Sequence, residues 1–255
     1  MPLIFQIVKY LFILVIAVFL FLVFIKNSYF YGGISLSLIL TFLGSYFLLS
    51  RKIKNWKKNL YYSLLPFLLV ASGIFYLVFV EILIVKVVII LSLVLLLFTY
   101  CKEILKESFT VPLVIAEKPR QFFLLLAVII IFFLFSGLFG LNDFLSVSVI
   151  FLILPGGILI LVLTTYLIFQ EDKLGLSKLN IFLIMAAIMM ELFWAISILP
   201  LVFYLKGLII SLCYLLILQF LLISRLGEGF KKVIRIYLII IFLLLAVLLV
   251  TSRWF

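Results

Sequence analysis

The sequence contains no histidine, only two cysteines and few charged residues. Charged residues make up 11% of the 255 positions, whereas they make up about 25% of an ordinary globular domain. Without histidine, the chain lacks the commonest metal ligand and the side chain that most readily carries protons near neutral pH. Cys101 and Cys213 lie far apart and form no CxxC spacing, so neither a disulfide framework nor a thiolate metal site is expected. We therefore expect no metal and no cofactor.

Hydrophobic residues, by contrast, fill 69% of the chain, and the mean hydropathy is +1.55. The apolar runs are long and continuous rather than alternating, which favours membrane-spanning helices over the strands of an outer-membrane barrel. A helix satisfies its own backbone hydrogen bonds inside hydrocarbon, which an isolated strand cannot do. The sequence thus predicts an all-α, polytopic integral membrane helical bundle, with one transmembrane domain over residues 1–255 and no soluble domain.

About nine transmembrane helices fit the apolar runs, since a bilayer core of about 30 Å needs roughly 20 helical residues. We expect the first to be retained, because no small-x-small cleavage site follows its apolar stretch. The turn between the third and fourth spans is expected near Glu81 and Lys86, a possible outer-face charge pair, with Ala71–Gly73 as the rival position. The expected spans are 3–25, 31–50, 60–80, 83–100, 121–141, 144–169, 180–199, 205–224 and 235–251.

The distribution of basic residues predicts the orientation. If the N-terminus is cytoplasmic, the inside connectors carry 15 of the 20 Lys and Arg residues, and the outside connectors and C-terminus carry three, Lys26, Lys206 and Arg253. This positive-inside asymmetry places the N-terminus in the cytoplasm and the C-terminus outside. It also explains the net charge of +11 without a nucleic-acid partner. The expected location is the plasma (inner) membrane of a prokaryote.

Glu191 is a lone carboxylate inside the seventh expected span. A charged side chain at a helix centre costs roughly 2.5 to 3.5 kcal/mol on insertion scales, so either protonation or a polar partner must offset it. Thr164, Thr165 and Gln219 are candidate partners, whereas Lys206 is expected to reach outward to water. The favoured interpretation is an interhelical hydrogen-bonding residue, and the alternative is a proton or cation site.

Pro155, Gly156 and Gly157 lie inside the sixth expected span. Proline removes one helix hydrogen bond and glycine lowers the cost of bending, so a kink is expected there. A broken helix can direct backbone groups at an ion or substrate, but a packing kink is the simpler interpretation. A cavity lined by both Pro155 and Glu191 would favour transport.

The cytoplasmic connectors offer two kinds of surface. The connector from Cys101 to Arg120 mixes charges and is the expected site for a protein partner. Two other connectors are strongly basic, and each Lys or Arg near anionic headgroups gains about 1 kcal/mol. These lipid-facing basic residues are Arg51, Lys52, Lys54, Lys57, Lys58, Arg225, Lys231, Lys232 and Arg235.

Three functional hypotheses remain. No GxxxxGK[ST], HExxH or GxSxG motif is present, and the outer connectors offer only Asn142, Asp143, Glu81 and Lys206 as polar groups. We therefore expect a non-catalytic scaffold or assembly subunit of a membrane complex. The first alternative is a secondary transporter or channel-like protein coupled to protons through Glu191, and the second is a lipid-modifying enzyme.

Overall fold

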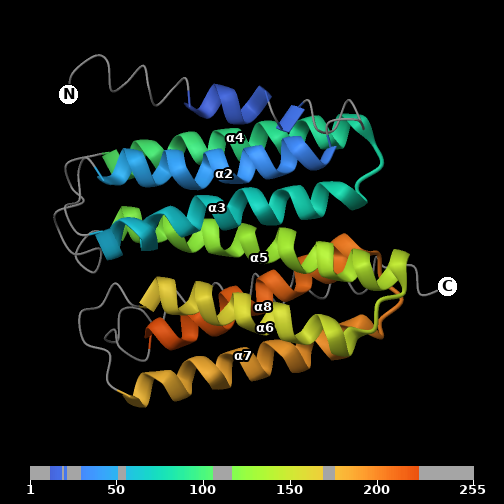
Figure 1. Cartoon of the computed structure of the whole chain (residues 1–255). Coiled ribbons are helices and arrows are strands. Elements are labelled where there is room, and N and C mark those ends of the chain that lie inside the picture. The colour runs from blue at the N-terminus through green and yellow to red at the C-terminus, as the bar shows by residue number, and fades with distance from the viewer. Residues whose placement is uncertain are drawn as a thin grey trace. The chain divides into compact units, whose positions relative to one another are not determined.

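The computed structural model of the chain describes residues 12–18, 20–21, 30–50, 56–105, 117–168 and 176–223. These residues form helices joined by short connections, with no strand in the described ranges, which confirms the all-α prediction. A short helical segment covers 12–18. The longer helices, shown in Figure 1, are α2 (Phe30–Ser50), α3 (Trp56–Phe79), α4 (Leu83–Leu105), α5 (Glu117–Leu145), α6 (Val149–Ile168), α7 (Leu176–Ser197) and α8 (Phe203–Ile223).

Four helical stretches in the described residues are long and apolar enough to cross a membrane: Gly32–Ser50, Tyr62–Phe79, Leu83–Glu103 and Phe122–Leu145. Shorter apolar stretches cover Val149–Thr165, Phe182–Ser197 and Phe203–Gln219. The ninth expected span and most of the first lie outside the described residues. The four long stretches define a helical membrane protein.

The helices expose large hydrophobic side chains on their surfaces. Ile84 and Leu91 on α4 are 74% and 63% exposed, and Phe151 on α6 is 76% exposed. Soluble monomers rarely present contiguous apolar patches larger than a few hundred Å². Side chains of this kind are covered by lipid tails when a helix spans a bilayer.

The chain reverses between α3 and α4 at residues 80–82, beside Glu81. Glu81 is exposed there, and the backbone N–H of Lys86 donates to Ile82 O at 3.1 Å in the first turn of α4. The rival position, Ala71–Gly73, lies within α3. The acid therefore marks the turn, and the proposed pairing of Glu81 with Lys86 stays a prediction.

The chain divides into two compact units, Met1–Arg120 and Gln121–Phe255, and each is described by itself. In the first unit, α3 packs against both α2 and α4, and Figure 1 shows α2 alongside α3. A Cβ added to Gly73 on α3 would lie 2.5 Å from Leu93 Cδ1 on α4, so glycine permits the close approach expected at Ala71–Gly73. The Tyr100 hydroxyl of α4 also donates to Tyr62 O of α3.

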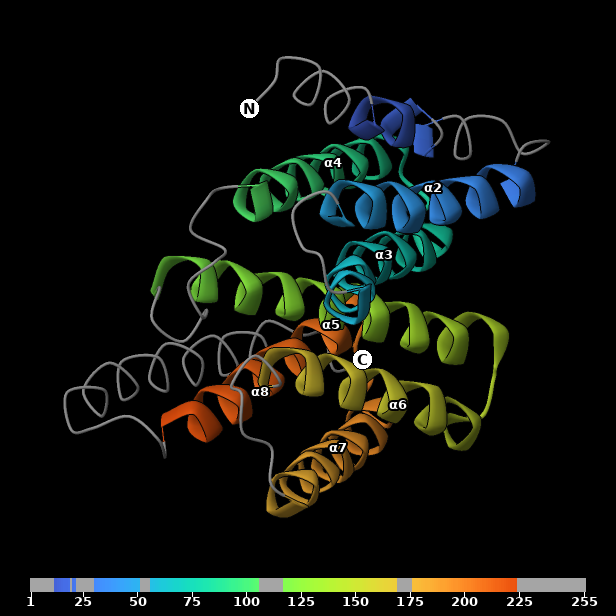
Figure 2. The ribbon, with the colours of Figure 1, turned by 60° about the vertical axis from the view of Figure 1, so that its left-hand side comes forward.

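In the second unit, α7 packs against α6 and α8, as Figure 2 shows. Its core contains Phe135 and Phe139 of α5, which hold Phe193 of α7 with ring centroids 5.4 and 4.7 Å apart. All three rings are fully buried. Offset and edge contacts of this type add about 0.5–1.5 kcal/mol to the burial of each pair, so these rings fix α5 against α7.

Hydroxyl groups inside the helices are mostly satisfied by their own helix. Ser37, Thr41, Ser45, Ser63 and Ser72 are buried, and each donates to a backbone carbonyl three or four residues earlier at 2.6–3.1 Å. Such bonds remove the hydroxyl proton from competition for water or substrate. These side chains therefore behave as packing residues rather than as the lining of a polar path.

Candidate functional site

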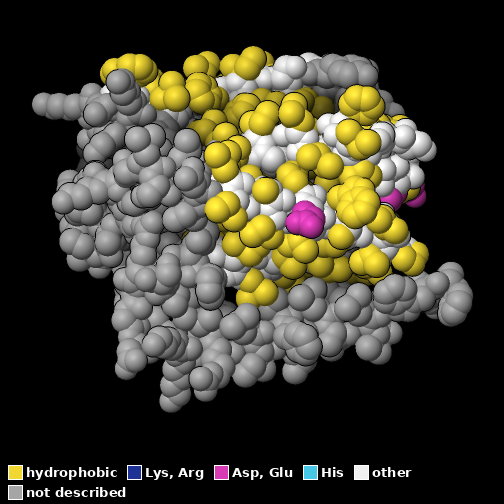
Figure 3. All heavy atoms as spheres, turned by 90° about the horizontal axis from the view of Figure 1, so that it is seen from below, with side chains coloured by type: hydrophobic (Ala, Val, Ile, Leu, Met, Phe, Trp, Pro, Cys, Tyr) yellow, Lys and Arg dark blue, Asp and Glu magenta, His cyan; other side chains and the backbone are white. Residues whose placement is uncertain are grey.

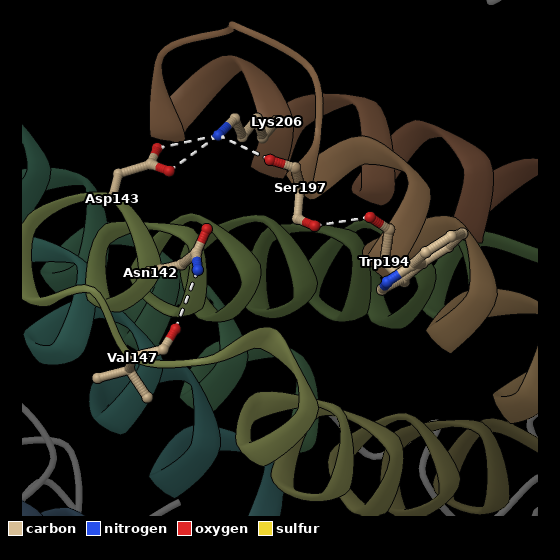
Figure 4. A network of polar contacts seen from close by, with 6 residues as sticks. All are labelled: Asn142, Asp143, Val147, Trp194, Ser197 and Lys206. Carbon is tan, nitrogen blue, oxygen red and sulfur yellow. Dashed lines mark hydrogen bonds and ion pairs between the residues drawn. The ribbon is translucent and has the colours of Figure 1, made fainter.

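The main polar site of the second unit joins three helix ends around Lys206 (Figure 4). Lys206 lies in the first turn of α8, and its Nζ donates to Asp143 Oδ1 at 2.9 Å and Oδ2 at 3.1 Å. The same ammonium group donates to Ser197 O, the last residue of α7, at 3.4 Å. Because Asp143 lies near the end of α5, one side chain ties α5, α7 and α8 together.

Lys206 is only 4% exposed, contrary to the expectation that it would reach outward to water. An ammonium group removed from water needs an acceptor for each of its three protons, and two carboxylate oxygens and one carbonyl lie within hydrogen-bond distance. The Phe139 ring lies 5.7 Å from Nζ and adds a cation–π contact. The Asp143 side chain is 29% exposed, so the pair lies at the edge of the bundle.

The dipoles of α5 and α7 favour this arrangement, and that of α8 opposes it. The ammonium group lies beside the C-terminal ends of α5 and α7, where unpaired carbonyls concentrate negative charge. Without a carboxylate, a cation in the first turn of α8 would be unfavourable, because the N-terminus of a helix carries partial positive charge. Asp143 offsets that repulsion, and we therefore interpret the site as a structural junction.

The end of α5 is closed by a second set of contacts, of which Figure 4 shows the bond between Asn142 and Val147. Ser146 follows α5 with φ of 53°, the left-handed conformation that commonly terminates a helix and is usually occupied by glycine. The N–H of Val147 donates to Leu141 O at 3.3 Å, and Asn142 Nδ2 donates to Val147 O at 2.9 Å. These bonds satisfy groups that the helix end would otherwise leave unpaired and hold Asp143 in place.

Glu191 lies on the exposed side of α7, away from the Lys206 junction. It is six residues before Ser197, the end of α7, which corresponds to about 9 Å along a helix. Within the described residues, Glu191 makes no hydrogen bond or ion pair. The expected partner Thr164 is fully buried and donates instead to Met185 Sδ at 3.7 Å. The role of Glu191 as an interhelical hydrogen-bonding group stays a prediction.

The Pro155-Gly156-Gly157 segment lies within a continuous helix, because α6 runs from Val149 to Ile168 without a break. Pro155 is exposed. A Cβ on Gly156 would lie 3.5 Å from Met190 Cε, and one on Gly157 would lie 3.5 Å from Met190 Cγ. The glycines therefore provide a surface on which Met190 of α7 packs. Pro155 and Glu191 both lie on exposed surfaces.

Several expected surface sites lie outside the described residues or side chains. This applies to all nine basic residues predicted to face lipid headgroups, and to most of the expected partner connector between Cys101 and Arg120. Both assignments stay predictions. In the described part of the chain, no group of three or more His, Cys, Asp and Glu side chains has a metal-binding arrangement, and neither Cys101 nor Cys213 takes part in a disulfide.

The Lys206 junction is the site that the sequence did not predict. Lys206 and Asp143 were both visible as polar residues of the outer connectors, but they are 63 positions apart. Their pairing depends on α5 and α8 being neighbours, which no local pattern reveals. Their predicted position in the membrane was a usable signal. Each residue lies within a few positions of a helix end, and both ends are on the predicted outer side of the membrane.

The fold is that of a helical membrane protein, and an ion pair joins three helix ends at the edge of its second unit. Comparison of the chain with protein-family models, curated proteins and solved structures finds no match in any of the three.

Proposed function

We propose that the chain is a non-catalytic scaffold or assembly subunit of a complex in the inner membrane of a prokaryote. In this proposal it crosses the membrane nine times, with the N-terminus in the cytoplasm and the C-terminus outside. The junction of Lys206, Asp143 and Ser197 then lies at the outer side, together with the turn at Glu81. The 15 basic residues of the inside connectors support this orientation.

The composition of the helix interior supports a role in packing. Aromatic rings and aliphatic side chains fill the described core of each unit, and the five buried serine and threonine hydroxyls of the first unit bond to their own helices. The buried ammonium group of Lys206 is already bound by Asp143 and Ser197. A group so fully engaged stabilises a helix arrangement and is poorly placed to exchange ions.

The observation that carries the proposal is the position of Glu191. An ionisable side chain in a spanning segment normally faces the bundle interior or a partner, and Glu191 instead faces outward on α7. Lipid tails offer no hydrogen bond to a carboxyl group. A second protein in contact with α7 would supply one, which is the arrangement of a subunit in a complex.

Proton-coupled transport receives less support, because the two features that suggested it lie on exposed surfaces. Glu191 lies on the exposed face of α7, so its carboxylate does not line a path through the second unit. We therefore expect wild type and Glu191→Gln, reconstituted in liposomes under a pH gradient, to show the same proton flux. Loss of flux in the variant alone would favour the transporter hypothesis.

The scaffold function is tested in native membranes. A tagged chain, extracted in a mild detergent, is expected to migrate as a complex larger than its own 29.4 kDa and to bring down a partner in fixed stoichiometry. An equally hydrophobic, unrelated multi-pass protein with the same tag provides the control. A chain that remains monomeric in native membranes, by both native mass and cross-linking, would contradict the proposal.

A further inference from the structure

The outward side of α7 forms a continuous face along the helix. Its exposed residues recur every three or four positions, which places them on one side of a helix. They are hydrophobic or small apart from one acid, and they are Leu183, Ile184, Ala187, Ile188, Glu191, Trp194, Ala195 and Ile198. Figure 3 shows an acidic side chain surrounded by hydrophobic ones on the surface seen from below. We call these eight residues the α7 face.

Contact with lipid alone does not account for Glu191 on this face. Ionised side chains inside a bilayer are costly, and they normally face the bundle interior or a partner. Glu191 lies about 9 Å from the end of α7, and a glutamate side chain is too short to place its carboxyl group at that end. The described part of the chain gives it no hydrogen-bond donor. A helix that contacts the face and carries a hydrogen-bond donor would satisfy this carboxyl group.

The residues beside Glu191 are suited to contact with another helix. Ala187 and Ala195 lie one turn before and one turn after it, and both are exposed. Small residues at four-residue spacing allow two helix backbones to approach closely in a membrane. A lipid-covered surface gains nothing from alanine at these positions. The sequence Ala187-x3-Glu191-x3-Ala195 therefore forms a shallow strip with an acid at its centre.

We propose that the α7 face binds a transmembrane helix of another protein, and that this helix carries one lysine or arginine side chain at the depth of Glu191. We choose lysine or arginine as the partner side chain because a cation both donates hydrogen bonds to the carboxylate and neutralises its charge. Trp194 is one turn away and 54% exposed, so its ring can contact the same cation. The inference rests on the proposed function and names the surface and the partner chemistry.

A second copy of this chain fits the face less well. Two copies joined through their α7 faces would bring Glu191 against Glu191, which places like charges together. The buried cation of the second unit, Lys206, is already bound by Asp143 and Ser197. The complementary charge is therefore expected on a different chain.

Synthetic transmembrane peptides test the inference directly. The probe is a leucine- and alanine-rich helix with a single lysine six residues from one end of its apolar segment, and the control peptide has leucine at that position. Association with the purified full-length protein in liposomes is followed by energy transfer. The wild type is expected to bind the lysine peptide about tenfold more tightly than the leucine peptide, a size typical of polar contacts between membrane helices.

Two variants decide the outcome. Glu191→Gln keeps the shape of the side chain and removes its charge, so it is expected to abolish the preference for lysine. Replacing Ala187 and Ala195 with isoleucine is expected to weaken binding of both peptides. Equal binding of the two peptides by the wild type, or a lysine preference that survives in Glu191→Gln, would overturn the inference. So would self-association of the wild type that is lost in Glu191→Gln, which would identify a second copy as the occupant.

Failure of this inference can be distinguished from failure of the proposed scaffold function. Each variant's unfolding temperature is compared with that of the wild type, so that loss of binding is not confused with loss of fold. In native membranes, a complex that keeps its mass with Glu191→Gln leaves the scaffold function intact and rejects the α7 face as its contact. If the wild-type chain forms no complex in native membranes, the scaffold function itself is rejected.

Discussion

Lys206 shows how a single side chain can organise the end of a membrane bundle. Its stem and ammonium group are buried, yet all three proton positions have an acceptor nearby. A buried ion pair adds little net stability relative to well-packed hydrophobic residues, but removal of one partner leaves an uncompensated charge. Substitution of one partner alone is therefore expected to destabilise the protein more than substitution of both.

We expect Asp143→Asn to lower the free energy of unfolding of the second unit by about 2 kcal/mol, below the range for fully buried pairs because Asp143 is partly exposed. Lys206 would keep its burial and lose its counter-charge. The measurement is thermal unfolding of the purified protein in detergent.

Two controls accompany that substitution. Glu81→Gln removes an exposed acid from a connection and is expected to leave the unfolding temperature unchanged. Replacing Asp143 with leucine and Lys206 with methionine together removes both charges and is expected to recover most of the lost stability. Equal losses from the single and double changes would argue against the ion pair.

Ser146 occupies a backbone conformation that glycine adopts at lower cost. The left-handed region costs a residue with a Cβ roughly 1–2 kcal/mol, and the described chain has Ser146 at φ of 53°. We expect Ser146→Gly to raise stability by up to about 1 kcal/mol, and Ser146→Val to lower it because branching increases the strain. Both are read from chemical unfolding, and a stabilising valine would contradict this account of the turn.

At the scale of elements, the close contact between α5 and α8 depends on a glycine. A Cβ on Gly207 would lie 2.0 Å from Ser136 Oγ, 2.7 Å from Ser136 N and 2.9 Å from Ser136 Cα. The hydroxyl group can rotate away, but the backbone atoms of α5 cannot move without shifting the helix. Ser136 is fully buried at this contact.

Gly207→Ala is therefore expected to destabilise the protein. Overpacking costs typically 1–3 kcal/mol, about 1 kcal/mol of which alanine recovers through its better helix propensity. Gly32→Ala is the matched control, since nothing lies within 4 Å of a Cβ added there and only the propensity gain applies. Unfolding of both variants in the same detergent checks the difference, and similar shifts would show that α5 and α8 are not in tight contact.

The sequence predicted where helices form but not which way they face. The turn at Glu81 was predictable because a charge marks the cheapest exit from the membrane. The direction of Glu191 was not, because α7 is hydrophobic on every side and so lacks the polar stripe that identifies the outer face of a soluble helix. In lipid, the buried and exposed faces have nearly the same composition, and only packing distinguishes them. The pairing of Asp143 with Lys206 was not predictable either, because it depends on how α5 and α8 pack.

At the scale of the whole molecule, the nine proposed spans are an odd number, which would place the two termini on opposite sides of the bilayer. We expect a fluorescent protein fused to the N-terminus to fluoresce, and alkaline phosphatase fused to the C-terminus to be active outside the cytoplasm. The reciprocal fusions are the controls. Termini found on the same side would contradict the nine-span proposal and leave the helical membrane class unaffected.

The junction at the end of α5 also has a consequence for the order in which the chain is made. Asp143 enters the membrane with α5, while Lys206 follows 63 residues later with α8. Until α8 is inserted, the growing protein holds an acid without its counter-ion, and α7 has no ammonium group at its last carbonyl. Arrival of Lys206 completes both contacts at once, so a chain truncated before α8 is expected to be recognised as unfinished and degraded.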